Sequence, residues 1–281
     1  MLLLNKKNLT ALPLDSVDPA TLEKISAREN AITTLPAMLW ELPALRVLSL
    51  GDNPLTSIPP AIGNLTTLTH LYLDGNQVTA LPETIGQLTR LHTLDIGHCR
   101  LETLPESLQN LTELVFLYIS DNQLKACPDW IGKLTNLQYL NMTDNQLQDM
   151  LASIGDLTQL IELRLYNNRL TTLPDSVCKL SNLRELHLRG NIISQLPPEM
   201  GAMKSLRMVD MRNNKLSKLP PSIGQLEKLL YLDLRGNNLK SLPTTIANLS
   251  NLEKLDLRWN QFEEKSPAMR QLEHRGCLVY I

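Results

Sequence analysis

The apolar positions of this chain recur with a fixed period of 23 residues. Residues 58–76 read IPPAIGNLTTLTHLYLDGN, and similar wording returns along the chain. Aligning the repeats gives the pattern L-x-x-L-x-L-x-x-N-x-L-x-x-L-P-x-x-I-G-x-L-x-x. A fixed period of this length indicates a repeat architecture, because one repeat cannot bury its apolar face alone and must stack on its neighbours.

Each repeat contains two kinds of hydrophobic spacing. Leu71 and Leu73 alternate with polar or aromatic residues, and a period of two predicts a short strand with one buried face. Pro59, Ile62 and Leu65 are spaced by three, which predicts one or two helical turns entered through a proline. We therefore expect a strand and a helical turn to alternate in every repeat.

One asparagine follows the strand of nearly every repeat. We expect its side chain to hydrogen-bond to backbone groups of the turn, in its own repeat and the adjacent one, so that no buried turn backbone is left unsatisfied. Cys99 takes the asparagine position once, as a small, weakly hydrogen-bonding side chain in a buried slot. The structural column consists of Asn30, Asn53, Asn76, Cys99, Asn122, Asn145, Asn168, Asn191, Asn214, Asn237 and Asn260.

The repeat register extends to both ends of the sequence. Leu2 lies 23 residues before Ile25, so the first strand is expected almost at Met1. Near the other end, Leu278 and Tyr280 fall at inward strand positions and predict a terminal strand, CLVYI. Bare terminal strands can pair with other chains; we expect a monomer, with an edge-mediated dimer as the alternative.

The wording L-x-x-L-P-x-x-I-G-x-L resembles the leucine-rich repeat family over essentially the whole chain. It is most similar to the 23-residue class of cytosolic Ras-group scaffolds and bacterial leucine-rich-repeat proteins. The resemblance implies an α/β fold: a curved solenoid with a parallel β-sheet on its concave face and short helical or 3-10 turns on its convex face. We expect one domain over residues 1–281, with a partial repeat at 1–21, eleven repeats at 22–262 and a C-terminal cap with a terminal strand at 263–281.

Composition narrows the class of protein. The net charge is −2, from 27 basic and 29 acidic residues, so no global field draws the chain to nucleic acid or to an anionic membrane. Residues 1–140 carry a charge of −5 and residues 141–281 carry +3. The start MLLLNKK is too short for a signal peptide, and the four cysteines are dispersed. These features predict a cytoplasmic protein, or one delivered by a signal-peptide-independent secretion system.

The sequence contains no recognisable catalytic motif. The five histidines show no H-E-x-x-H or Cys/His metal spacing, and no phosphate-binding glycine loop or G-x-S-x-G is present. We therefore expect no enzymatic activity, no cofactor and no metal site.

Aromatic residues gather in the positions that flank the inward leucines of each strand. These positions face the concave side, and five of the six tyrosines lie there. Tyrosine and phenylalanine are enriched in binding hot spots, which favours a partner-binding patch; the alternative is that tyrosine is simply a good strand residue. The aromatic zone comprises His70, Tyr72, Asp95, Phe116, Tyr118, Tyr139, Asn141 and Tyr166.

Charged residues occupy the same positions in the later repeats. Asp210, Asp233 and Asp256 share one column, and an arginine column lies beside it. Two interpretations remain open: an ion-pair lattice of small net energy, or a docking strip for a charged partner. The proposed docking residues are Arg189, Asp210, Arg212, Tyr231, Asp233, Arg235, Arg258 and Trp259, and Glu162, Arg164, Glu185 and His187 continue the columns.

The leading hypothesis is a non-catalytic scaffold that holds a protein or peptide on its concave face. The alternative is a substrate-targeting subunit, or a secreted bacterial effector, that acts with an enzyme on another chain. A small-ligand or nucleic-acid surface is a third, weaker hypothesis, because the face has charges of both signs and no basic stripe.

Overall fold

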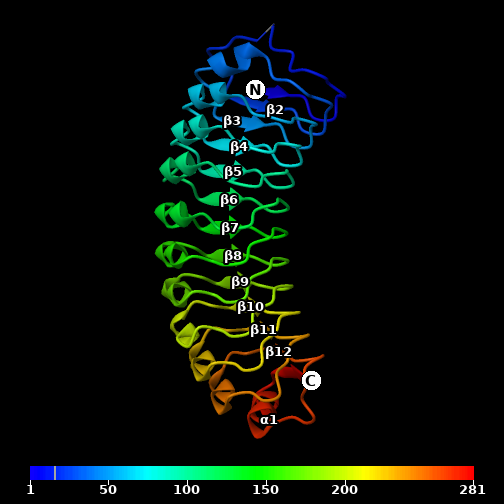
Figure 1. The fold of residues 1–281 in the computed structure, drawn as a ribbon, viewed down its shortest axis with the longest axis vertical. Helices are drawn as coiled ribbons and strands as arrows, with labels where there is room; N and C mark the ends of the chain where they lie inside the picture. Colours follow the sequence, from blue (N-terminus) through cyan, green and yellow to red (C-terminus); the bar gives the residue numbers. More distant parts are fainter. Residues whose placement is uncertain (16) are drawn as a thin grey trace. The chain divides into compact units, whose positions relative to one another are not determined.

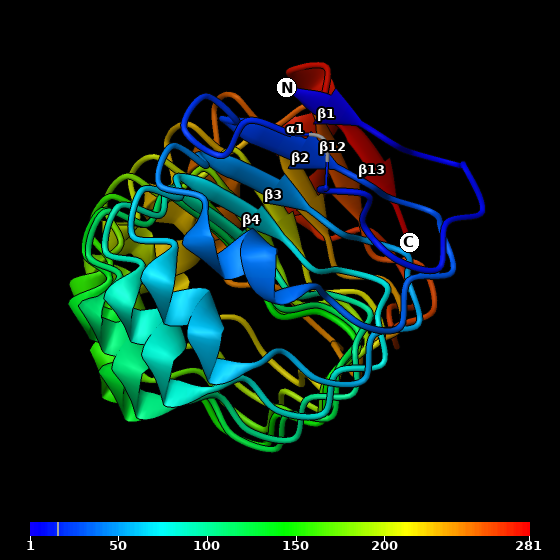
Figure 2. The ribbon, with the colours of Figure 1, turned by 90° about the horizontal axis from the view of Figure 1, so that it is seen from above.

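The computed structural model describes residues 1–15 and 17–281, and the chain divides into two compact units. Unit 1 comprises Met1–Lys125 and unit 2 comprises Ala126–Ile281. Within each unit, strands lie side by side, and from β2 to β12 a 3-10 helix lines the other side of the repeats (Figure 1). Figure 2 shows this separation of strands and helices in a view from above.

Unit 1 contains six parallel strands joined in chain order. The strands are β1 (Leu2–Leu3), β2 (Lys24–Ser26), β3 (Val47–Ser49), β4 (His70–Tyr72), β5 (Thr93–Asp95) and β6 (Phe116–Tyr118). The 3-10 helices are η1 (Ala37–Glu41), η2 (Pro60–Asn64), η3 (Glu83–Gln87) and η4 (Glu106–Asn110).

Unit 2 repeats the arrangement with seven parallel strands. The strands are β7 (Tyr139–Asn141), β8 (Glu162–Arg164), β9 (Glu185–His187), β10 (Met208–Asp210), β11 (Tyr231–Asp233), β12 (Lys254–Asp256) and β13 (Leu278–Tyr280). The helices are η5 (Asp129–Lys133), η6 (Ala152–Asp156), η7 (Asp175–Lys179), η8 (Met200–Ala202), η9 (Pro221–Gln225), η10 (Thr244–Asn248) and the α-helix α1 (Pro267–His274).

The buried positions are those that the repeat pattern predicts. Leu71 is fully buried and Leu73 nearly so, while Ile62 and Leu65 bury the inner side of η2. Pro59 precedes η2 in an extended conformation and so fixes the entry to the helix. The predicted fold, parallel strands opposite short 3-10 turns, is confirmed in both units.

The asparagine column satisfies turn backbone between adjacent repeats. The Nδ2 atom of Asn53 donates to the carbonyl oxygens of Ala27 in the preceding repeat (2.9 Å) and of Leu50 in its own (2.9 Å). Its Oδ1 atom accepts from the backbone N–H of Ile32 at 3.1 Å. Since Asn53 is only 3% exposed, water cannot replace these partners.

Cys99 is half-buried, whereas the sequence analysis assigned it a buried slot. Its Sγ atom lies 3.5 Å from the carbonyl oxygen of Leu73, the group to which an asparagine would donate. Burial raises the pKa of the Cys99 thiol to about 11, although the backbone N–H groups of Asn76 and Val78 point to the sulfur and oppose the shift. The thiol therefore keeps weak versions of the hydrogen bonds that an asparagine makes.

One predicted detail of the C-terminal strand is wrong. The register of β13 pairs Leu255 with Val279, so the spacing there is one residue longer than the usual 23. Val279 is buried, whereas Leu278 is 57% exposed and Tyr280 is 41% exposed. The extra residue lies between Leu272, which is buried as predicted, and β13, where Gly276 has a φ of 93°. A slip of one residue exchanges the two faces of a strand.

Among the residues that the structure describes, no helix is long and apolar enough to cross a membrane.

Candidate functional site

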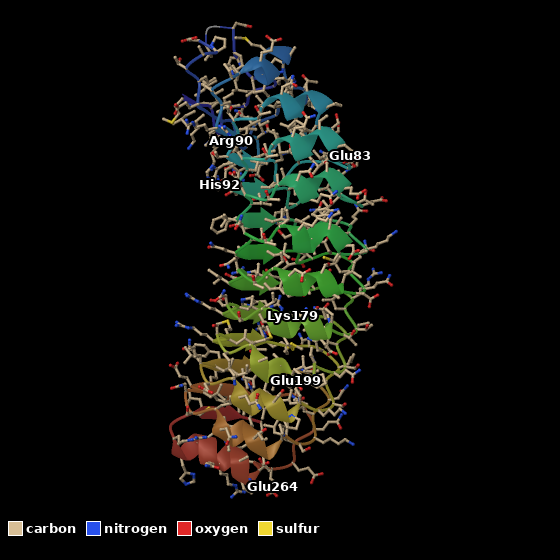
Figure 3. The ribbon with its side chains drawn as sticks, turned by 90° about the vertical axis from the view of Figure 1, so that its left-hand side faces the viewer. Glu83, Arg90, His92, Lys179, Glu199 and Glu264 are labelled. Atoms are coloured by element: carbon tan, nitrogen blue, oxygen red, sulfur yellow. The ribbon has the colours of Figure 1, made fainter. Side chains whose placement is uncertain are left out.

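The exposed side of the parallel sheet, here called the sheet face, carries the candidate site residues in each unit. In unit 1 the sheet face includes His70, Tyr72, Asp95, Phe116 and Tyr118. Figure 3 shows His92, next to β5, on the strand side of the molecule, and Glu83 on the helix side. The sheet face of unit 2 carries the remaining candidates from Tyr139 to Trp259.

The aromatic residues of unit 1 lie in two rows across β4, β5 and β6. The register places Tyr72, Asp95 and Tyr118 in one row. His70 stacks on Tyr72 with 6.4 Å between ring centroids, and Phe116, in the other row, is 39% exposed. The structure therefore separates the aromatic pairs of β4 and β6 by β5, which contributes Thr93 and Asp95.

An ion-pair cluster that the sequence analysis missed borders these rows. Arg28 donates from Nη1 to Asp74 Oδ1 at 2.7 Å, from Nη2 to Asp74 Oδ2 at 2.5 Å, and to Asp52 Oδ2 at 3.0 Å. Gly51 lies beneath the guanidinium, where a Cβ would come within 2.5 Å of Arg28 Nη1. Gly51 stands at a position that carries an outward side chain in other repeats. This glycine was the sequence feature that could have indicated the ion pair across it.

The pKa of Asp95 responds to this environment. Burial raises its pKa to about 6, and the nearby charge of Asp74 adds to the shift. The backbone N–H of Gly97, which donates to Asp95 Oδ1 at 3.1 Å, opposes it, as does the charge of Arg28. Asp95 is therefore partly protonated near neutral pH.

In unit 2, arginines lie against two of the candidate tyrosines. The guanidinium of Arg164 lies 5.6 Å from the ring centroid of Tyr139, and that of Arg189 lies 5.4 Å from that of Tyr166. Contacts of this kind stabilise an exposed pair by roughly 0.5–1 kcal/mol. Tyr139 and Tyr166 are thus held by cations of the same face. The continuity of one aromatic patch over both units stays a prediction.

Three aspartate–arginine pairs form a lattice over β10, β11 and β12. Arg212, Arg235 and Arg258, each just after a strand, donate from Nε and Nη2 to the aspartate two residues earlier that ends the strand, with Nη2–Oδ2 distances of 2.5, 2.7 and 2.6 Å. Contacts between strands are longer: Arg212 Nε to Asp233 is 3.6 Å and Arg235 Nε to Asp256 is 3.5 Å. This geometry supplies the ion-pair lattice that the sequence analysis considered.

Asp256 is the buried centre of the lattice. Its side chain is 0% exposed and lies within ion-pair distance of Arg258, Arg235 and Lys254. Burial opposes ionisation, but the hydrogen bonds from Arg258 and the charge of Arg235 outweigh it and hold the Asp256 pKa below its ordinary value.

A hollow of about 230 Å³ opens in the sheet face beside the lattice. Tyr231, at its rim, is 39% exposed, and its hydroxyl donates to Glu253 Oε2 at 2.6 Å. That hydrogen bond raises the Tyr231 pKa. The lining residues are Met208, Val209, Asp210, Arg212, Tyr231, Leu232, Asp233, Lys254 and Asp256.

Trp259 projects from the turn after β12. Its φ of 60° is uncommon for a bulky residue, and its side chain remains 72% exposed. The guanidinium groups of Arg235 and Arg258 lie 6.0 and 5.8 Å from the ring. The turn therefore presents a large aromatic surface beside the arginines.

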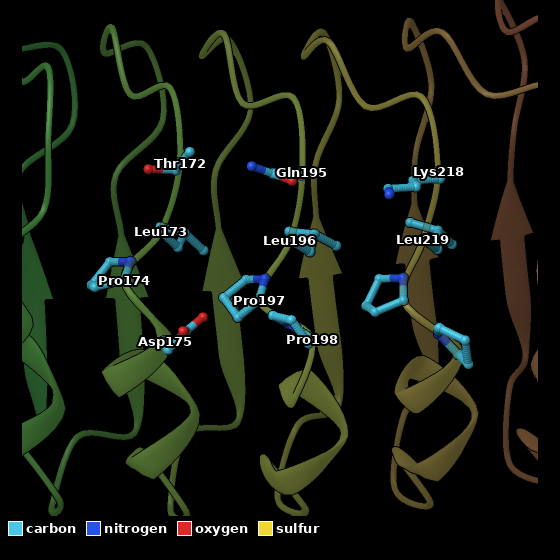
Figure 4. A pocket seen from close by; sticks show the side chains of 12 residues that line it. Thr172, Leu173, Pro174, Asp175, Gln195, Leu196, Pro197, Pro198, Lys218 and Leu219 are labelled. Atoms are coloured by element: carbon cyan, nitrogen blue, oxygen red, sulfur yellow. The ribbon is translucent and has the colours of Figure 1, made fainter.

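A second hollow, of about 600 Å³, lies outside the sheet face and was not predicted (Figure 4). Prolines that begin three consecutive helical segments line it. Next to the hollow, η8 has three residues whereas its neighbours have five, because Pro198 and Glu199 precede the helix instead of belonging to it. Asp175 and Lys218 are its charged residues.

The described cysteines are poorly suited to nucleophilic chemistry. Burial raises the thiol pKa of Cys127 to about 12 and that of Cys178 to about 11. Burial also raises the pKa of Cys277. Since the thiolate is the reactive form, these side chains act as small apolar groups.

Comparison with known proteins identifies the class. A model described as "Leucine-rich repeat region" matches residues 21–173 and 171–276. The chain therefore belongs to the leucine-rich repeat family, as its sequence pattern predicts. A comparison with curated proteins finds none that matches the chain.

Solved structures show the same fold. The Arabidopsis receptor kinase HAESA, in complex with the peptide hormone IDA and the co-receptor SERK1, is 32% identical with a TM-score of 0.75, over 85% of this chain and 42% of that chain. A TDR receptor is 26% identical with a TM-score of 0.80, over 97% of this chain and 47% of that chain. InlJ from Listeria monocytogenes is 24% identical with a TM-score of 0.79, over 93% and 53%. The chain spans about half the length of these structures.

Proposed function

We propose that this chain is a non-catalytic scaffold that holds a protein or peptide partner on its sheet face. The observation that carries the proposal is the row of Arg212, Arg235 and Arg258, each fixed by the aspartate two residues before it. Side chains held in this way lose little conformational entropy when a partner binds. The family supports the proposal, and the HAESA structure is a complex with a peptide hormone.

The free atoms of this row define the chemistry of the partner. Each aspartate takes the Nε and Nη2 atoms of its arginine, and among the described residues Nη1 of these three arginines has no hydrogen-bond partner. Strands are about 4.8 Å apart, so the free N–H donors recur at that spacing. Carboxylates are the groups that guanidinium donors bind most strongly. We therefore infer a partner with acidic side chains.

Exposure supports the same choice of charge. The side chains of Arg258 and Lys254 are 41% and 39% exposed, whereas Asp210 is 13% and Asp256 is 0% exposed. At these positions a partner meets cations first, while Arg235 and Asp233 between them are about equally exposed, at 20% and 22%. Tyr231 and Trp259 add exposed aromatic surface beside them, which suits hot-spot contacts.

Selection from a displayed library of random peptides, with the wild-type chain immobilised, tests this function. We expect enriched peptides to be acidic, and their measured affinity to fall by roughly tenfold when Arg212 or Arg258 is changed to Gln. Lys218→Gln, in the proline-lined hollow, is the matched control and should bind like the wild type. Circular dichroism checks that each variant is folded.

Salt provides a second criterion. An electrostatic row predicts affinity that weakens as ionic strength rises from about 0.05 to 0.5 M, because exposed charges are screened. A salt-insensitive affinity, or equal binding by both arginine variants and the wild type, would overturn the proposal. The alternative, a targeting subunit or a secreted effector that acts with an enzyme on another chain, stays a prediction. The partner-binding role of the aromatic residues of unit 1 also stays a prediction.

A further inference from the structure

Two carboxylates and one imidazole converge on the sheet face of unit 2. Glu162 of β8 and Glu185 of β9 are direct register partners, and His187 follows two residues later on the same face of β9. One ligand atom from each residue lies within 4.8 Å of the other two. We propose that Glu162, Glu185 and His187 form a binding site for a divalent transition-metal ion such as Zn²⁺.

The distances are close to those of a metal site. His187 Nε2 lies 3.0 Å from Glu185 Oε2 and 3.7 Å from Glu162 Oε1. Metal–ligand bonds of about 2.0–2.1 Å in tetrahedral geometry place ligand atoms roughly 3.3 Å apart. Rotation of the glutamate side chains is enough to close the set, because Glu185 is 42% exposed and has room to move.

The electrostatics favour a cation between the two carboxylates. Like charges directly opposite on neighbouring strands destabilise a sheet. Arg164 Nε donates to Glu162 Oε1 and offsets part of this repulsion. Among the described residues, Oε2 of Glu162 and Oε1 of Glu185 have no partner, so each carboxylate keeps an oxygen available.

The donor set indicates the class of metal. One imidazole nitrogen with two carboxylate oxygens suits Zn²⁺, Co²⁺ or Ni²⁺, whereas Mg²⁺ and Ca²⁺ prefer oxygen ligands alone. Three protein ligands leave a fourth position open to water or to a donor from a bound molecule. The side chains of His187 and Glu162 are 15% and 19% exposed, so the ion would be partly shielded from solvent.

We expected no metal site because no local sequence motif contains these three ligands. Here the ligands are 23 and 25 residues from Glu162, and the parallel register alone brings them together. The site does not depend on the proposed peptide-binding role of the arginine row.

Calorimetric titration of the chain, free of any affinity tag, with ZnCl₂ tests the proposal. We expect one saturable site in the wild type and loss of that site in His187→Ala. The matched control is His98→Ala, because His98 Nδ1 also contacts a carboxylate, Asp121 Oδ2 at 2.9 Å, but that pair belongs to no three-ligand group among the described residues. The control should keep wild-type stoichiometry and affinity.

Two further variants sharpen the test. Glu185→Gln should weaken Zn²⁺ binding at least tenfold, while Arg164→Ala should strengthen it roughly tenfold, the effect of removing one positive charge about 5 Å from a dication at the dielectric constant of water. Absorption of bound Co²⁺ gives an independent readout of histidine ligation. The proposal is overturned if the wild type shows no saturable Zn²⁺ site, or if His187→Ala binds Zn²⁺ as the wild type does.

Discussion

Arg28, just after β2, reaches Asp74 two strands further along the sheet face of unit 1 by passing over Gly51. The two residues are 46 positions apart in the chain. The bidentate pair exists because the intervening strand offers no side chain at that point. A glycine that looks like a weak position in the strand pattern is therefore part of an electrostatic contact.

Gly51→Ala should break this ion pair. The new Cβ would lie 2.5 Å from Arg28 Nη1 and 2.7 Å from Asp74 Oδ1, and the flexible arginine would move away. We expect the free energy of unfolding in urea to fall by about 1 kcal/mol. In an Arg28→Gln variant, Gly51→Ala should lower the free energy of unfolding by almost nothing further. If the losses of the two single variants add up in the double variant, disruption of the Arg28–Asp74 pair is not the cause.

Asp95→Asn should stabilise the protein at pH 7.5 and have little effect at pH 4. The carboxyl pKa rises from about 3.9 in the unfolded chain to about 6 in the fold. Stability linked to its proton is therefore present below about pH 4 and is lost as pH rises through about 6. After allowance for solvent screening, the gain at pH 7.5 is about 1–2 kcal/mol.

Urea unfolding at the two pH values measures this difference. Asp149→Asn is the control. Because Asp149 is exposed, this substitution should change the stability equally little at both pH values. Equal stabilisation by Asp95→Asn at pH 4 and pH 7.5 would show that burial and the charge of Asp74 do not govern the site.

Asp256→Asn should destabilise the protein at neutral pH, the opposite of the effect expected for Asp95→Asn. Its folded pKa is depressed, so its contribution is present above the unfolded pKa of about 3.9 and is lost as pH falls. Because Arg258, Arg235 and Lys254 lose their shared anion, we expect a loss of about 2 kcal/mol at neutral pH. Asp210→Asn should cost less, since Arg212 is the one ion-pair partner of Asp210 among the described residues; a larger cost there would refute this ranking.

Cys99→Asn should stabilise unit 1. An asparagine there would accept from the Val78 N–H and donate to the Leu73 carbonyl, as Asn122 does for Leu101 and Ile96. We expect a gain of about 1 kcal/mol, measured as a rise of roughly 2–4 °C in melting temperature. Cys99→Ala, which can make neither bond, should lower it. A lower melting temperature for the asparagine variant would show that the slot has adapted to sulfur.

The sequence predicts the scaffold because the scaffold is periodic. Inward residues such as Leu71 and Ile62 follow from spacing alone, and the column positions of Arg235 and Asp233 follow from the register. Among the described strand pairings, the expected register is wrong before β13, because a pattern of constant length cannot predict one extra residue.

The contacts of the candidate site were less predictable than the fold. The register fixes which residues lie side by side on neighbouring strands, but the side-chain conformations decide which of them bind one another. The column positions of Arg212 and Asp210 were expected, but not that each aspartate would bind the arginine of its own strand more closely than that of the next. Glu162, Glu185 and His187 were noted as column members, yet their convergence depends on rotamers that the sequence does not specify.

The glycine of the 3-10 helices controls how tightly the repeats of each unit approach one another on the helix side. At Gly86, Gly155, Gly201 and Gly224, an added Cβ would come closer than 3.0 Å to a serine or threonine carbonyl oxygen of the next repeat. The strands keep their hydrogen-bonded spacing whatever stands there. A larger residue would therefore increase the distance between two adjacent repeats on the helix side, while their distance on the strand side stays fixed. The angle between the two repeats would change. Substitution at one of these glycines would thus change the local curvature without altering any residue of the sheet face.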